Sequence, residues 1–148
     1  MPSRLLPAIL ACALLVLTAS SGSGEEASRS VALYKNPDCG CCESYAAYLR
    51  ANGFAVTVKP THELSAMSRE AGIPDELQGC HLSIIDGYAV SGHVPVDSVR
   101  RLLSERPEIK GITLPGMPLG SPGMNGSKTE PFTVYEIGDG RPKVYAVE

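Results

Sequence analysis

The sequence lacks the features that define several common functional classes. It has no cluster of basic residues, since 13 Lys and Arg stand against 16 Asp and Glu for a formal net charge of −3. Nucleic-acid binding depends on clustered cations that neutralise phosphates, so this balance argues against a nucleic-acid partner. No apolar run reaches the roughly 20 residues of a membrane-spanning helix. No internal repeat is visible either, and the 148 residues fit one globular domain.

Glycine and proline, by contrast, are abundant. The chain has 15 Gly and 12 Pro, and both residues break helix interiors. A helical bundle is therefore excluded, which leaves a mixed α/β or a β-rich domain.

Residues 1–24 have the composition of a secretory signal peptide. Arg4 precedes an apolar run from Leu5 to Leu17, and small residues follow as far as Gly24. We expect export and cleavage near the end of this segment, which leaves no membrane span. Lipidation at Cys12 is disfavoured because the apolar run continues beyond it.

The remainder divides into a linker over residues 25–30 and a single domain over residues 31–148. Hydrophobic periodicity and turn signals predict alternating strands and helices. In chain order we expect strand 31–34, helix 42–52, strand 54–59, a helix over 64–71 capped by Thr61, strands 82–85 and 88–90, and helix 97–104. The first two strands, joined through a helix, must be parallel, whereas Asp86-Gly87 predicts an antiparallel hairpin. The order β-α-β-α-β-β-α is that of a thioredoxin-like α/β domain.

The C-terminal third is less regular. Residues 107–131 show no clear periodicity and are rich in Gly, Pro and Met, which predicts a long loop that is either functional or disordered. Strands over 132–137 and 143–147 then form a terminal β-hairpin.

Three cysteines lie within four residues, at Cys39, Cys41 and Cys42, in the turn between the first strand and the first helix. Unpaired N–H groups at a helix N-terminus favour thiolates, so this turn suits local chemistry better than a disulfide framework. Three alternatives stay open: a surface disulfide with one spare thiol, a Cys39/Cys42 redox pair, or a soft metal site. Clustered thiolates favour Cu(I), and more than one ion is possible.

Further candidate ligands follow along the chain. Cys80 and His81 precede the third strand, where the predicted topology brings them towards the cysteine turn. Each taken alone is more often a buried core residue, but together beside thiolates they favour ligation. For His93, metal ligation is as well supported as a role at the start of a helix or on the surface, and His62 is expected to be exposed.

Two methionines lie in the Gly/Pro-rich segment. Met117 and Met124 have no helical face to fill, and a thioether is a ligand for Cu(I). A packing role in a structured loop remains the alternative.

Five motifs in one order resemble an exported metal-binding family that includes the CopG-type proteins of bacterial copper resistance. They are Lys35 to Cys42, Cys80-His81, Asp86-Gly87-Tyr88, Gly92 to Pro95, and Gly116-Met117-Pro118 with Gly120 to Met124. The resemblance spans residues 31–148. It implies a thioredoxin-like fold, a periplasmic location and copper binding through the cysteine motif.

The sequence thus predicts a periplasmic protein that holds Cu(I) in copper resistance or homeostasis. Transfer of copper to a periplasmic copper-handling partner protein and electron transfer to or from copper are both compatible with an exposed cysteine turn. The predicted ligands are Cys39, Cys41, Cys42, Cys80, His81, His93, Met117 and Met124. A non-enzymatic role is favoured, although copper-linked redox activity is compatible with the motif. The main alternative is a thiol–disulfide oxidoreductase using Cys39 and Cys42, and a structural zinc site is disfavoured because closed zinc sites usually pair two separated C-x-x-C units.

Overall fold

The structure is a computed structural model that describes residues 28–148. The predicted signal peptide lies outside these residues and stays a prediction. Within the described range, no helix combines the length and the apolar character needed to cross a membrane.

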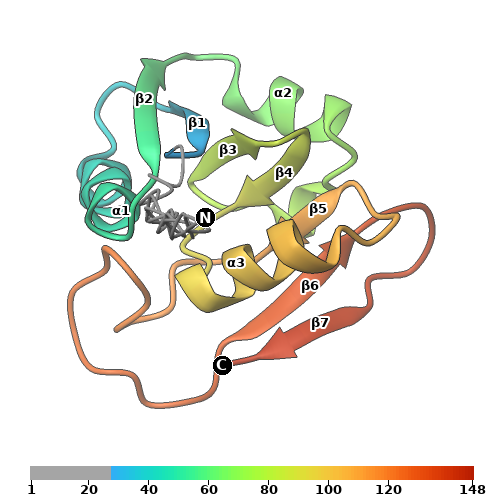
Figure 1. Cartoon of the computed structure of the whole chain (residues 1–148). Coiled ribbons are helices and arrows are strands. Elements are labelled where there is room, and N and C mark those ends of the chain that lie inside the picture. The colour runs from blue at the N-terminus through green and yellow to red at the C-terminus, as the bar shows by residue number, and fades with distance from the viewer. Residues whose placement is uncertain (1–27) are drawn as a thin grey trace, which may run out of the picture.

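The described chain is a mixed α/β fold built on one sheet of seven strands (Figure 1). The strand order across the sheet is β2-β1-β3-β4-β5-β6-β7. In chain order the elements are β1 (Ser30–Lys35), α1 (Gly40–Ala51), β2 (Ala55–Pro60), α2 (Leu64–Glu70), the short 3₁₀ helix η1 (Asp75–Leu77), β3 (His81–Ile85), β4 (Tyr88–Ser91), α3 (Val96–Glu105), β5 (Gly111–Thr113), β6 (Thr133–Ile137) and β7 (Val144–Val147).

The predicted order of strands and helices is confirmed. β1 pairs with β2 in parallel, and β3 pairs with β4 in an antiparallel hairpin. Asp86 and Gly87 adopt φ of 49° and 87°, the positive values that a tight two-residue hairpin turn requires. The terminal hairpin of β6 and β7 also forms where it was expected.

Two details of the prediction were wrong. The segment 107–131 is not entirely loop, because Gly111–Thr113 forms β5 between β4 and β6. A strand of three residues is too short to show a period, and pairing on both sides stabilises it. Thr61 does not cap α2; its Oγ1 accepts a hydrogen bond from the Glu63 N–H in the turn ahead of that helix.

Buried side chains form two clusters, one on each face of the sheet. The larger cluster joins α1 and α3 to the sheet through residues such as Leu49, Leu102 and Val90. The smaller cluster contains Leu64 of α2 and Leu82 of β3. Neighbouring strand residues point to opposite faces, so the sheet is covered by helices on both sides.

The pairing of β1 with β3 determines where the cysteines meet. The strands are antiparallel, and Lys35 at the end of β1 is the partner of His81 at the start of β3. The turn that leaves β1 and the segment that leads into β3 therefore lie at the same end of the sheet. This confirms the neighbouring placement that the topology predicts for Cys80 and the cysteine turn.

Close backbone packing holds the segment before β3 in place. A Cβ atom at Gly79 would collide with the backbone of Gly92, which itself has a φ of +75°. The Gly79 N–H also donates a hydrogen bond to Ser91 Oγ over 2.9 Å. The residue before Cys80 is thus confined by the end of β4.

We expect Gly79→Ala to lower the free energy of unfolding by about 1–3 kcal/mol, because the added methyl has no room without a backbone shift. Gly138→Ala is the matched control, since a Cβ there meets nothing within 4 Å. Chemical denaturation of the oxidised, metal-free proteins measures both. Equal stability of the two variants would contradict the close packing.

Candidate metal centre

The cysteine turn sits at the N-terminus of α1. Cys39 is the residue immediately before the helix, and its N–H donates to the Asn36 carbonyl over 3.1 Å. Cys41 and Cys42 occupy the first helical turn, where backbone N–H groups lack partners within the helix. The positive end of the helix dipole lies at this position and faces the cysteine sulfurs.

The turn contains both a disulfide and a free thiol. Cys39 and Cys42 are joined in a disulfide with a Cα–Cα distance of 5.5 Å, while Cys41 and Cys80 are free. Cys42 is buried, whereas the other three cysteines are half-buried. The motif is therefore oxidised in this structure, and reduction of the disulfide would leave three thiols in the turn.

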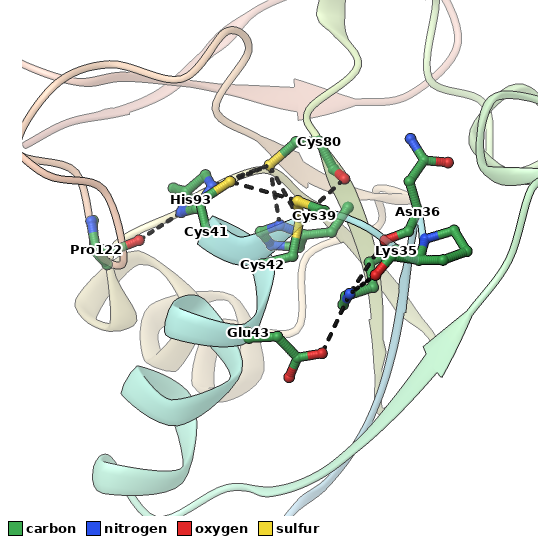
Figure 2. Close-up of a disulfide and its surroundings, with 11 residues drawn as sticks. Lys35, Asn36, Cys39, Cys41, Cys42, Glu43, Cys80, His93 and Pro122 are labelled. Carbon is green, nitrogen blue, oxygen red and sulfur yellow. Dashed lines mark hydrogen bonds and ion pairs between the residues drawn. A yellow bond between two sulfur atoms is a disulfide. The ribbon is translucent and has the colours of Figure 1, made fainter.

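Cys80 completes a cluster of four sulfurs. Its Sγ lies 3.6 Å from the Sγ of Cys42 and 3.8 Å from that of Cys41, and Cys39 Sγ is 3.5 Å from Cys41 Sγ. All four sulfurs lie within 4.8 Å of one another (Figure 2). Sulfur ligands about 2.3 Å from a tetrahedral metal are roughly 3.8 Å apart, so these three non-bonded contacts match the spacing of a thiolate site. The sulfurs of Cys39 and Cys42 reach it only after their disulfide is reduced.

Two buried histidines approach the same cysteine. Cys80 Sγ lies 3.0 Å from His93 Nε2 and 3.5 Å from His81 Nδ1. The ligand atoms of Cys80, His81 and His93 are mutually within 4.8 Å, which makes a second group of potential metal ligands. His93 follows β4 just ahead of α3, so its helix-start position and its contact with the cluster coexist.

The loop after β5 determines the orientation of the His93 ring. His93 Nδ1 lies 2.6 Å from the Pro122 carbonyl oxygen (Figure 2). A carbonyl can only accept, so Nδ1 carries the proton and donates it. In the neutral ring Nε2 then has a free lone pair directed at Cys80, the arrangement typical of metal-binding histidines.

Burial determines the protonation of these groups. It lowers the pKa of His81 to about 3, with a further contribution from His93, and it lowers the pKa of His93 as well. Both imidazoles are therefore neutral near pH 7. Burial and the neighbouring Cys41 raise the pKa of Cys80 to about 12, so a metal ion that binds this sulfur must displace a proton.

Two residues that the sequence reasoning did not assign to the site support it. The Lys35 side chain is only 3% exposed, and its Nζ donates to the carbonyls of Asn36 and Pro37 over 3.2 and 2.9 Å. Nζ also lies 3.3 Å from a Glu43 carboxylate oxygen (Figure 2). Lys35 stands directly ahead of the turn in the sequence, but no local pattern reveals that its amine folds inwards.

Tyr45 is the second supporting residue. Its ring centroid lies 4.5 Å from that of His81 and 5.4 Å from that of His93. Its hydroxyl donates to the Val94 carbonyl over 2.8 Å. Tyr45 follows Cys42 by three residues on α1, and this helical spacing was the available signal that it shares a face with the cysteine turn.

The two methionines are placed differently. Met117 is 53% exposed, and Met124 is half-buried. Their loop packs closely against α1 beside the site: a Cβ atom at Gly123 would lie only 2.7 Å from the backbone nitrogen of Tyr45, so there is no room for a side chain there. Ligation by these methionines stays a prediction. His62 is exposed, as expected.

The fold and the site together define a mixed α/β protein with a cysteine and histidine cluster suited to a metal ion. The sequence model of a family described as protein of unknown function, DUF411, matches residues 77–124. The curated proteins contain no match.

Two solved structures are similar over most of their length, and both are of a copper resistance protein, CopG. Form 2 of that protein is 35% identical with a TM-score of 0.75, and the alignment covers 82% of this chain and 98% of that chain. Form 1 is 36% identical with a TM-score of 0.74, covering 80% and 96%. The chain belongs to the CopG-type family, which confirms the family expected from the motifs.

We expect Lys35→Met to lower the free energy of unfolding by about 1–3 kcal/mol, because two carbonyls of the turn lose their donor. Glu43→Gln removes the charge partner but keeps the amine, and its carboxylate is 55% exposed, so a change within about 0.5 kcal/mol is expected. Chemical denaturation of the oxidised proteins tests both. A Lys35→Met protein as stable as the wild type would show that the turn does not depend on the amine.

Proposed function

We propose that this protein is a periplasmic copper-binding protein of thioredoxin-like fold that holds Cu(I) in copper resistance. The observation that carries the proposal is the convergence of four cysteine sulfurs, Cys39, Cys41, Cys42 and Cys80, within 4.8 Å of one another. The relatives of known structure are described as copper resistance proteins, which supports the choice of metal.

The donor set explains why Cu(I) suits the reduced cluster. Soft thiolates prefer Cu(I) over harder divalent ions, and a cluster of four can bridge more than one ion. The N-terminus of α1 places its unpaired N–H groups beside the negative sulfurs and offsets part of their charge. Copper is the cargo in this proposal, and the half-buried sulfurs of Cys39, Cys41 and Cys80 give a partner protein access to it.

His81 and the two methionines complete the proposed copper path. His81 Nδ1 lies next to Cys80 and adds a nitrogen ligand at the buried side of the cluster. Met117 and Met124 form a weaker outer site in the loop, where thioethers keep their affinity for Cu(I) under conditions that oxidise thiols.

The reduced protein should bind Cu(I) in preference to Zn(II), and Cys80→Ser should lower its Cu(I) affinity by at least about tenfold because one soft ligand is lost. Anaerobic competition against a chelator of known affinity measures this. His62→Gln is the matched control, since His62 is exposed. A preference of the reduced protein for Zn(II) would contradict the assignment of copper.

Two further measurements are decisive. If Cys80→Ser retains full Cu(I) affinity while its metal-free form is destabilised by about 1–3 kcal/mol, Cys80 is a core residue and not a ligand. If replacing Met117 and Met124 with Leu leaves copper uptake unchanged under oxidising conditions, the loop has a structural role only.

A second candidate function is thiol–disulfide exchange. The observation that favours it is the Cys39–Cys42 disulfide at the start of α1, with Cys39 accessible and Cys42 buried. In such a reaction the Cys39/Cys42 dithiol would be oxidised as a partner disulfide is reduced. Redox enzymes of this layout carry a cis-proline where this chain has Cys80 and His81, so we rank this function second.

We expect the protein to reduce insulin disulfides roughly 100-fold more slowly than thioredoxin does under the same conditions, because Cys80 and His81 stand at the start of β3 in place of a cis-proline. A turbidity assay with a thiol reductant as electron donor measures the rate. Cys41→Ser, which keeps the Cys39/Cys42 pair, controls for the extra thiol. Turnover at a thioredoxin-like rate would make oxidoreductase activity the leading assignment.

A further inference from the structure

The Cys39–Cys42 disulfide changes which atoms can bind a metal. A cysteine sulfur binds a metal ion as a thiolate, and neither sulfur of an intact disulfide is a thiolate. In the oxidised protein the cluster therefore loses two of its four sulfur donors. The donors that remain are the sulfurs of Cys41 and Cys80 and the nitrogens of His81 and His93.

We propose that Cys80, His81 and His93 form a separate subsite that binds a divalent cation of borderline softness, such as Zn(II), while Cys39 and Cys42 are joined in the disulfide. This subsite, the Cys80/His81/His93 site, does not rest on the Cu(I) proposal. It shares one sulfur with the four-cysteine cluster and takes a different class of ion.

The distances fit such an ion. Zinc lies about 2.3 Å from sulfur and about 2.0–2.1 Å from nitrogen, which places tetrahedral S and N ligands roughly 3.5 Å apart. The Cys80 sulfur is 3.5 Å from His81 Nδ1 and 3.0 Å from His93 Nε2. If a metal ion replaces the proton between Cys80 and His93, the Cys80 sulfur and His93 Nε2 must move apart by about half an ångström.

The histidine rings are prepared for binding. The Pro122 carbonyl accepts the His93 Nδ1 proton and so leaves Nε2 free to bind, as a supporting residue does in established metal sites. The His81 ring is fully buried, its Nε2 has no hydrogen-bond partner among the described residues, and its Nδ1 has the Cys80 sulfur beside it. Burial of a ring with so few hydrogen-bond partners costs free energy of folding, and a cation bound at Nδ1 would be a strong partner for that nitrogen.

The chemistry of the donor set selects the ion. One thiolate with two neutral imidazoles is a borderline set that suits divalent ions better than the all-sulfur cluster does. Such a set holds copper when its geometry is trigonal, whereas a tetrahedral arrangement of S and N ligands suits Zn(II). Cys41 Sγ is 3.8 Å from Cys80 Sγ but lies outside the mutually close group of Cys80, His81 and His93. The fourth coordination position is therefore open to water or to a small movement of Cys41.

The test uses the oxidised protein, with the Cys39–Cys42 disulfide verified by peptide mass mapping, titrated anaerobically with Co(II) and then with Zn(II). We expect one equivalent of Co(II), a thiolate-to-cobalt charge-transfer band, and full displacement by Zn(II). His81→Gln and His93→Gln should each weaken binding at least about tenfold, and Cys80→Ser should abolish the band. His62→Gln is the matched histidine control and should bind as the wild type does.

X-ray absorption of the Zn(II)-loaded oxidised wild type removes the dependence on variants that fail to fold. One sulfur or two sulfurs with two imidazole nitrogens supports the site, and the two-sulfur result assigns Cys41 as the fourth ligand. An all-sulfur shell, no stoichiometric Co(II) binding, or unchanged affinity in folded His81→Gln and His93→Gln would overturn it. Cu(I) binding by the reduced protein is measured separately, so failure of either proposal is recognised without the other.

Discussion

The antiparallel pairing of β1 with β3 is the constraint on which the metal centre depends. It aligns Lys35 with His81, so the chain leaves β1 and enters β3 at the same end of the sheet. The cysteine turn and Cys80 are separated by about 40 residues of sequence, and this register brings the Cys80 sulfur within 3.8 Å of the sulfurs of Cys41 and Cys42. Gly92 and His93 directly follow β4, the strand that pairs with the other edge of β3.

The features read correctly from the sequence were those with a local or topological signal. Cys39, Cys41 and Cys42 are close in sequence and precede a helical pattern. The position of Cys80 followed from the order of the strands, because a strand order fixes which ends are neighbours. The Asp86-Gly87 turn also has a local cause, since both residues adopt positive φ.

The features that were missed depend on tertiary contacts. β5 has three residues, and its pairing with β4 and β6 cannot be read from its own pattern. Lys35 would ordinarily be assigned to the surface, and only the carbonyls of the following turn explain its burial. For His93 the sequence left two roles in balance, because neither the sulfur at one ring nitrogen nor the carbonyl at the other is close in sequence.

The hydrogen bond between His93 and Pro122 connects metal binding with the order of the loop. Pro122 belongs to the long segment between β5 and β6, which passes beside the start of α1 (Figure 1). An imidazole that binds a cation through Nε2 becomes a stronger donor at Nδ1, so the hydrogen bond from His93 to the Pro122 carbonyl becomes stronger. Met117 and Leu119 are exposed apolar residues of the same loop, so the surface that they form is connected through Pro122 to the buried imidazole.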